Sequence, residues 1–174
     1  MKQKLVISAL SAALVCGPMA SFADAATYST GTATSTFTVS LTLQANCTIT
    51  ATALNFGTNG VLTTALNQQT TVAVDCTNTT PYNVGLDGGT VSGSTVTNRL
   101  LAGTATGNTT TTVAFQLYQD SAHTTVWGTT QGTNTIGGTG TGSVQTISVY
   151  GQIPVQTTPK PDTYQTTVTA TVYF

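Results

Sequence analysis

The side chains that could perform chemistry are few, and three of them lie close together around the single histidine. The segment DSAHTTVWG contains Asp120, Ser121 and His123. An acid, a hydroxyl and an imidazole are the groups of a nucleophilic triad, in which the imidazole takes the proton of the hydroxyl. Neighbouring residues of a turn rarely reach that geometry, and the sequence contains neither a nucleophile elbow nor an oxyanion loop. We therefore interpret His123 as a surface residue.

The other acidic residues and the glycines indicate no second centre for chemistry. The aspartates are isolated, without paired carboxylates and without the Asp-x-Asp-x-Asp spacing of a calcium loop. The glycine-rich segment 129–143 lacks the Lys-Ser/Thr of a phosphate-binding loop and opens no helix, so we predict a mobile surface loop. We predict no catalytic residue, no metal site and no cofactor, and therefore no enzyme.

The first residues have the features of an export signal. Lys2 and Lys4 precede an apolar stretch, residues 5–15, which is too short to span a bilayer. Two small-x-small sites then predict cleavage after Ala23 or Ala25. Because no second long apolar run follows, we expect an exported chain without membrane insertion.

Two cysteines remain once this leader is removed. Cys16 lies within it, and Val15 is too bulky for the small residue that precedes a lipid-modified cysteine. In an oxidising compartment, Cys47 and Cys76 most simply form one disulfide. A metal site is the alternative, but two thiols need two further ligands and His123 is the only histidine.

Charge is sparse along the chain. Beyond the leader the basic residues are Arg99 and Lys160, and the whole chain carries a net charge of −1. Two cations cannot neutralise a phosphate backbone, so we exclude nucleic-acid binding. Low charge also removes a common protection against pairing between exposed strand edges.

The elements that must position these residues are predicted to be β-strands. Threonine and valine dominate, helical periodicity is absent, and alternating segments are separated by Gly, Asn, Asp and Pro, as in a single-domain β-sandwich. The predicted strands are 47–57, 70–76, 81–87, 111–120, 143–155 and 164–174, with weaker candidates at 96–101 and 124–128. A bulge is expected near Gly151, where the inward face of the strand is ambiguous.

One further segment, TFTVSLTLQANCTI at 36–49, alternates between apolar and polar residues without a break. A strand of this kind has one wholly apolar face, which needs a hydrophobic surface to cover. Periodicity alone favours pairing within the chain's own sandwich. The segment nevertheless follows the leader directly, where it can act as a free arm.

Six segments together resemble a known family. They are NCTITATALNFG (46–57), VDC (74–76), YNVGLDGG (82–89), FQLYQDSAHTTVWG (115–128), VYGQIP (149–154) and PDTYQTTVTATVYF (161–174). In order and spacing they resemble the spore coat protein U-like domain and, within that family, the subunits of archaic, Csu-type chaperone–usher pili. Relatives often carry an acidic residue between Tyr164 and the last strand, which this chain lacks.

The resemblance implies an all-β, incomplete immunoglobulin-like sandwich that lacks its final strand and is completed by a donor strand from another chain. It divides the chain into a signal peptide (1–23), a donor-strand extension (24–45) and the spore coat protein U-like domain (46–174). The donor is expected at 32–43, and the side chains that enter a neighbour's groove are Phe37, Val39, Leu41 and Leu43. The residues expected to form the acceptor groove and to contact a chaperone are Ile49, Leu54, Phe56, Val168, Ala170, Val172 and Phe174.

The resemblance also implies a function and partners. Family members are structural pilins, which bind a periplasmic chaperone, are assembled by an outer-membrane usher and join copies of themselves or sibling pilins head to tail. The pilus lies outside the cell and serves surface attachment and biofilm formation. Because the last predicted strand stops at Phe174, we expect nothing after it to complete the fold. The alternatives are an exported coat or matrix protein without strand exchange, and a minor adhesive subunit near the tip.

Overall fold

The alternating β-branched segments form strands, as their pattern predicts. The computed structural model describes residues 30–174, and this range contains β-strands and no helix. The strands are β1 (Cys47–Ala51), β2 (Leu66–Cys76), β3 (Pro81–Leu86), β4 (Arg99–Gly103), β5 (Thr112–Tyr118), β6 (Ile136–Thr139), β7 (Val144–Ile153), β8 (Tyr164–Gln165) and β9 (Ala170–Tyr173). The all-β prediction is confirmed. The predicted signal peptide, with its cleavage after Ala23 or Ala25, lies outside the described residues.

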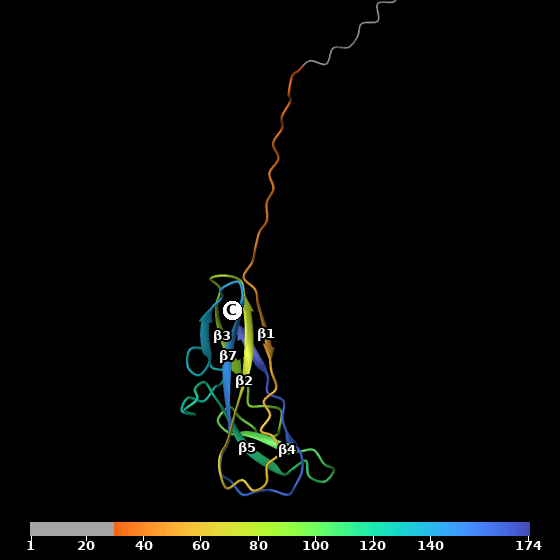
Figure 1. Ribbon diagram of the computed structural model, residues 1–174, viewed down its shortest axis with the longest axis vertical. Coiled ribbons are helices and arrows are strands. Elements are labelled where there is room, and N and C mark those ends of the chain that lie inside the picture. The colour runs from red at the N-terminus through yellow and green to blue at the C-terminus, as the bar shows by residue number, and fades with distance from the viewer. Residues whose placement is uncertain (1–29) are drawn as a thin grey trace, which may run out of the picture. The chain divides into compact units, whose positions relative to one another are not determined.

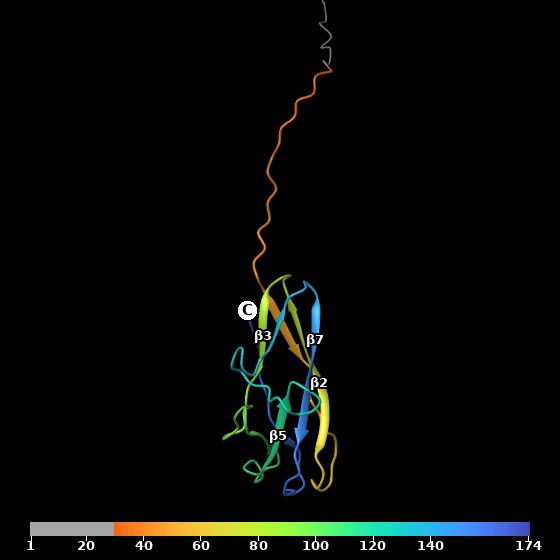
Figure 2. The same ribbon diagram turned by 90° about the vertical axis from the view of Figure 1, so that its left-hand side faces the viewer.

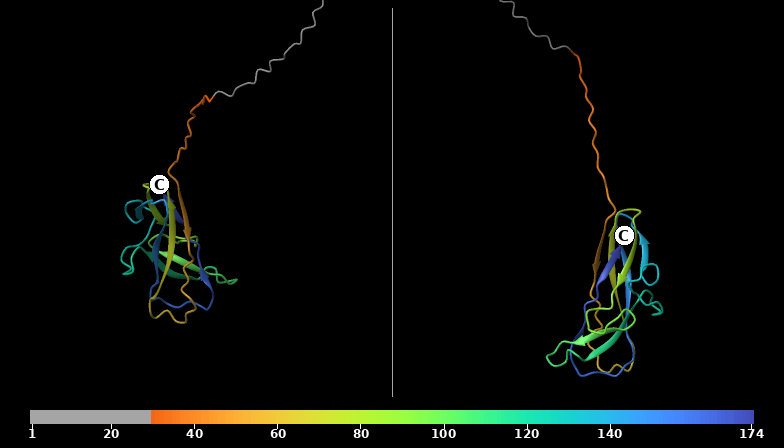
Figure 3. Two further views of the ribbon diagram at one scale, coloured as in Figure 1. Left: turned by 45° about the horizontal axis from the view of Figure 1, so that its top comes forward. Right: turned by 180° about the vertical axis from the view of Figure 1, so that it is seen from behind.

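Two antiparallel sheets form the layers of a sandwich. The larger sheet has the strand order β1-β2-β7-β5-β4-β8, and the smaller has the order β6-β3-β9. Figure 2 shows β3 and the long strands β2 and β7 as separate layers. The shorter strands β4 and β5 cross one end of the sandwich obliquely to β2 and β7 (Figures 1 and 3). Residues 30–174 include no apolar helix of membrane-spanning length.

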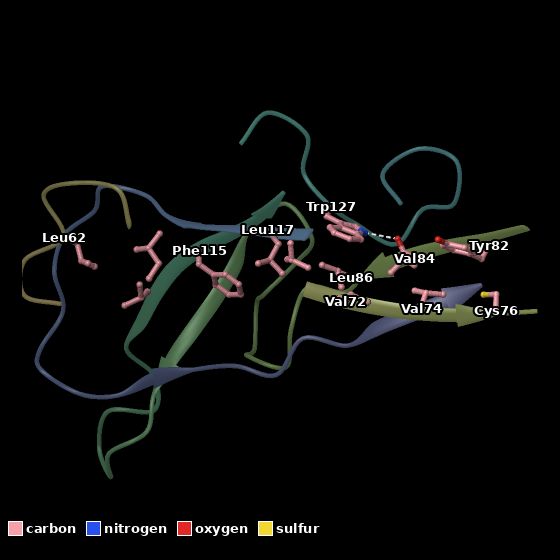
Figure 4. Packing of buried hydrophobic residues seen from close by; sticks show 13 residues of the cluster. Leu62, Val72, Val74, Cys76, Tyr82, Val84, Leu86, Phe115, Leu117 and Trp127 are labelled. Atoms are coloured by element: carbon pink, nitrogen blue, oxygen red, sulfur yellow. Dashed lines mark hydrogen bonds between the residues drawn. The ribbon is translucent and has the colours of Figure 1, made fainter. Parts of the chain in front are cut away.

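The hydrophobic core lies between the two sheets and extends along them. Figure 4 shows its side chains in a row, from Leu62 at one end to Tyr82 and Cys76 at the other. Trp127 is fully buried near the middle of this row, and its indole Nε1 donates to the carbonyl oxygen of Val84 at 2.8 Å. Burial of the large indole is therefore achieved without leaving its N–H unpaired.

Two predictions about the region after β5 are wrong. The segment 129–143 is not a structureless loop, because it contains β6, which pairs with β3. Gly138 allows close packing here, since a Cβ at this position would overlap the ring of Tyr82. Residues 124–128 form no strand; Val126 makes only an isolated bridge to Tyr118.

The bulge predicted near Gly151 is also wrong. Gly151 lies opposite Gln68 of β2 and opposite Leu117 of β5, and both ladders continue through it in register. Its neighbours Val149 and Ile153 are buried, which assigns the odd-numbered residues of β7 to the core. The reason for a glycine here is steric, and it concerns the groove described next.

Two predicted strands are interrupted by irregular segments, and both segments border the same opening. The strand predicted at 47–57 ends at Ala51, and residues 52–57 belong to no strand. The strand predicted at 164–174 is divided into β8 and β9 by residues 166–169. These two irregular segments flank an opening into the core.

Candidate strand-acceptor groove

Strand β1 is an edge strand whose outer side is unpaired within residues 30–174. It pairs only with β2. Thr52 N donates to the carbonyl oxygen of Thr71, and Thr77 N donates to that of Asn46, each at 2.9 Å. In an antiparallel ladder this alternation directs the backbone groups of even-numbered residues towards β2. The odd-numbered residues of 47–51 therefore direct their N–H and C=O groups towards the open side.

Strand β9 is the corresponding edge of the smaller sheet, and in the described chain it pairs only with β3. Asp87 N donates to the carbonyl oxygen of Thr169, and Thr90 N donates to that of Thr167, each at 3.1 Å. These bonds direct the odd-numbered residues towards β3. The even-numbered residues of 168–172 consequently have their backbone groups on the open side.

The two edges lie next to one another and enclose a groove that widens along its length. Some Cα atoms of β1 and β9 come within 8 Å of each other, although no ladder joins the two strands in the described residues. An inserted strand needs about 4.8 Å on each side, so these edges must move apart to admit one. Beyond Ala51 and before Ala170 the groove is already open, with a volume of about 980 Å³.

The predicted groove residues lie in two places. Leu54, Phe56, Val168 and Ala170 border the open part of the groove. Ile49 and Val172 pack against the core beside its narrow part, and Phe174 is 60% exposed. A second depression, of about 500 Å³, is bordered by Pro81, Asn83, Gln131, Val172, Tyr173 and Phe174.

The floor of the groove was not identified from the sequence. It consists of core side chains from β2, β4, β5 and β7, namely Val72, Leu101, Val113, Phe115, Leu117, Val149 and Ile153. The alternation of buried residues along β5 and β7 is the available signal, because alternate residues of β5, and Val149 and Ile153 of β7, face the opening. An entrance to the core is therefore open where a sandwich would normally be covered.

The segment predicted as the donor forms no strand. Residues 30–45 are all exposed and belong to no ladder. The exposed fractions of its alternating apolar side chains are 86% for Phe37, 83% for Val39, 82% for Leu41 and 80% for Leu43. None of these side chains is buried, so the expectation from periodicity alone, a strand within the chain's own sandwich, is wrong. Contiguous exposed apolar surface of this kind is typical of an interaction site.

The predicted disulfide between Cys47 and Cys76 is confirmed. The two residues lie opposite each other in the β1–β2 ladder, with their Cα atoms 4.1 Å apart. Because the sulfurs are bonded to one another, the alternative of a metal site does not apply. The crosslink joins the first residue of β1 to the last residue of β2.

A buried arginine joins three segments of the sandwich. The side chain of Arg99 is fully buried. Its guanidinium donates to the side-chain oxygen of Gln116 and to the carbonyl oxygens of Leu86, Asp87, Val96 and Trp127. Burial lowers the pKa of Arg99 to about 10, against the opposing charge of Asp87, so the side chain stays protonated at neutral pH. One cation thereby joins the end of β3, the turn before β4 and the segment that carries Trp127.

The segment on the other flank of the groove is held by Asp162. Its carboxylate accepts hydrogen bonds from Asn108 Nδ2 at 2.5 Å and from Ala105 N at 3.0 Å. These bonds, led by that from Asn108, lower the pKa of Asp162. The Tyr164 hydroxyl donates to the carbonyl oxygen of Lys160 at 2.8 Å. Residues 160–164 are in this way tied to the β4–β5 loop, which fixes one wall of the opening.

The residues considered for a catalytic triad are engaged in a turn. The carboxylate of Asp120 accepts from Thr125 N at 2.8 Å and from Thr124 N at 3.2 Å, and these bonds lower its pKa. The ring of His123 packs edge-on against Tyr118, with centroids 5.1 Å apart. Among residues 30–174 no cluster of three or more His, Cys, Asp or Glu could hold a metal ion.

Comparison with known proteins gives a consistent result. A crystal structure of the CsuC–CsuE chaperone–tip adhesion subunit pre-assembly complex, from archaic chaperone–usher Csu pili of Acinetobacter baumannii, contains a similar chain. The identity is 26% and the TM-score 0.54, over 76% of this chain and 40% of that chain. The present chain thus spans well under two thirds of the chain it matches. No curated protein matches. The Spore Coat Protein U domain model matches residues 33–171, from the exposed arm to the last strand, and the chain therefore belongs to the Spore Coat Protein U domain family.

Proposed function

We propose that the chain is a structural pilin of a chaperone–usher pilus that polymerises by donor-strand complementation. Residues 32–43 of one copy occupy the groove between β1 and β9 of the next. The observation that carries this proposal is that one chain has both halves of the contact. It has an exposed strand-like arm with alternating apolar side chains, and it has an apolar groove flanked by two backbone edges that are unpaired within residues 30–174.

The arm and the groove are expected to associate because each of them exposes apolar surface or unpaired backbone when it is uncovered. A buried backbone amide without a partner costs about 1–3 kcal/mol, and an uncovered strand edge invites aggregation. Burying each of Phe37, Val39, Leu41 and Leu43 contributes about 1.5–3 kcal/mol before the arm's ordering cost is counted. An arm that is inserted between β1 and β9 forms backbone hydrogen bonds with both strands. A strand added to a single sheet edge would be paired on one side only.

The proposal specifies the partners and the location. A periplasmic chaperone covers the groove first, an outer-membrane usher coordinates the exchange, and copies of the chain or sibling pilins follow. The contact is head to tail and does not close on itself, so it builds a filament. The filament extends from the cell surface, where it serves attachment and biofilm formation.

The test compares the full chain with three variants. Deletion of residues 32–43 is expected to abolish polymer formation, as measured by size-exclusion chromatography and electron microscopy. Leu41→Asp is expected to do the same, because it places a charge on the inserted face, whereas Thr42→Asp on the opposite face has a much smaller effect. Filaments formed by the deletion variant, or equal effects of the two aspartates, would disprove the assignment of the donor.

The family's description also favours a second candidate, an exported coat or matrix protein that uses the sandwich without strand exchange. In that case the deletion variant assembles into the same material as the full chain. A minor adhesive subunit near the tip is distinguished differently. It would depend on the arm, yet it would be found at filament ends rather than along the shaft by immunogold labelling.

A further inference from the structure

We propose that Gly151 is a positioning residue that sets the depth of the acceptor groove, and through it the size of the donor side chain that fits. The inference rests on the proposed function and concerns how the groove is shaped. Gly151 lies in the middle of β7, the strand between β2 and β5 in the larger sheet.

The backbone gives no reason for a glycine at this position. Its φ is not among the positive values of the chain, and the ladders on both sides of it are uninterrupted. A glycine inside a regular strand weakens the strand, so it commonly marks a place where another group approaches the backbone closely. Val149 and Ile153 are buried on either side, so a side chain at 151 would point into the sandwich.

The groups that approach are the two apolar side chains of the irregular segment after β1. A Cβ at position 151 would overlap Cδ2 of Leu54 and lie 3.0 Å from Cζ of Phe56. Leu54 and Phe56 therefore rest directly on the β7 backbone. They are partly buried there, and both border the groove.

Because Gly151 has no side chain, Leu54 and Phe56 lie closer to β7, and the groove above them is deeper. An alanine at 151 pushes Leu54 and Phe56 off the sheet, and the open volume of the groove is the space into which they can move. The cost to the fold is small, because the displaced atoms are ends of flexible side chains rather than backbone. The occupants that need the lost depth are large side chains of the arm, such as Phe37 or Leu41.

The experiment measures binding of a fluorescent peptide of residues 32–43 to the full chain carrying Leu41→Asp, which prevents its own arm from acting as donor. Addition of Gly151→Ala is expected to weaken binding about tenfold or more, which corresponds to about 1.4 kcal/mol or more. Gly137→Ala is the matched control, because a Cβ in β6 meets only Asn83 Oδ1 at 3.3 Å and the Tyr82 carbonyl at 3.7 Å. Adding Leu54→Ala to Gly151→Ala removes the displaced atoms and is expected to restore most of the affinity.

Four further peptides, each with one apolar donor residue replaced by Trp, keep the inference testable if the Gly151→Ala chain does not fold. The full chain carrying Leu41→Asp and Leu54→Ala is expected to bind at least one of these Trp peptides more tightly than the chain carrying Leu41→Asp alone. Equal binding by the Gly151→Ala chain, or no Trp peptide that gains affinity, overturns the inference while leaving the proposed function intact. If the chain carrying Leu41→Asp alone does not bind the peptide 32–43, both the inference about Gly151 and the proposed function are overturned.

Discussion

Asp87 shows how a single side chain serves both the core and the open edge of the groove. Its Oδ1 accepts hydrogen bonds from Gly89 N and Thr169 N, each at 2.9 Å, and its carbonyl oxygen accepts from Arg99. Burial by itself raises the pKa of Asp87, but the bonds from Thr169 and Gly89 and the charge of Arg99 outweigh it and lower the pKa below 3.8. The ionised form is thus favoured in the folded chain.

This direction predicts a pH dependence of stability. The folded chain holds the proton less tightly than the unfolded chain, so the contribution of Asp87 is complete well above 3.8 and is lost as the pH falls through the lowered pKa. Asp87→Asn removes the contribution. We expect the parent to be more stable than this variant at neutral pH, and the difference to vanish in acid. Urea unfolding at a series of pH values measures the difference in the free energy of unfolding between the parent and the variant. A difference that stays constant down to about pH 2 would show that ionised Asp87 does not contribute to stability.

At the scale of residues, local chemistry could be predicted from the sequence, whereas contacts between residues far apart in the chain could not. Two cysteines that follow a predicted export signal were expected to form a disulfide, and the bond between Cys47 and Cys76 confirms this prediction. The burial of Arg99 could not be predicted, because its acceptors on Leu86 and Trp127 are brought together only by the fold. A charged residue in a short strand normally lies at the surface.

At the scale of elements, strand positions were predictable from alternation, whereas strand ends were not. Periodicity cannot show where β1 stops pairing with β2, because the last backbone bond, from Thr52 N to Thr71 O, is followed by residues 53–57, which belong to no ladder. In this segment Leu54 and Phe56 lie directly on the bare backbone of Gly151, a contact between distant residues that alternation cannot show. The sequence alone predicts a bulge near Gly151, because a glycine within a strand can mark either a bulge or the close approach of another group.

The β1–β2 pair is expected to depend on its crosslink. The disulfide closes 29 sequence steps, and the chain-entropy model assigns such a loop about 3–4 kcal/mol. Replacing Cys47 and Cys76 by serine should therefore lower the free energy of unfolding by about that amount in urea titrations with saturating donor peptide. A reducing agent should destabilise the parent equally and leave the serine variant unchanged. If both proteins responded alike to the reductant, the loss would not come from this bond.

At the scale of the whole molecule, neither partner of the proposed contact relies on charge. Residues 32–43 contain no charged side chain. The groove floor is apolar, and the carboxylate of Asp162 at its margin is occupied by Asn108 and Ala105. Association should therefore be driven by apolar burial and backbone pairing, which salt does not screen.

We expect the affinity of the peptide 32–43 for the Leu41→Asp chain to change by less than about twofold between low and high sodium chloride, because screening acts on charge pairs. Fluorescence anisotropy at matched protein concentrations provides the measurement. A tenfold loss of affinity in high salt would show that an ionic contact, for example through Lys160, contributes to binding.

The overall architecture was the most predictable level. The family segments indicated an all-β sandwich with a separate N-terminal arm, and the fold class and the family are both confirmed. The predicted head-to-tail exchange remains a proposal, because a single chain contains the two surfaces but not their contact. The close approach of the β1 and β9 edges in the single chain could not be predicted from any pattern in the sequence.

The position of the disulfide has a mechanical consequence for a filament linked through its arms. Tension on an arm reaches the sandwich at Cys47, the first residue of an edge strand, where hydrogen bonds could be peeled apart one at a time. The covalent bond to Cys76 passes that load directly to β2, which is bonded to neighbours on both sides. Tension along such a filament would therefore load β2 and its two neighbouring strands instead of unzipping β1 from the sheet edge.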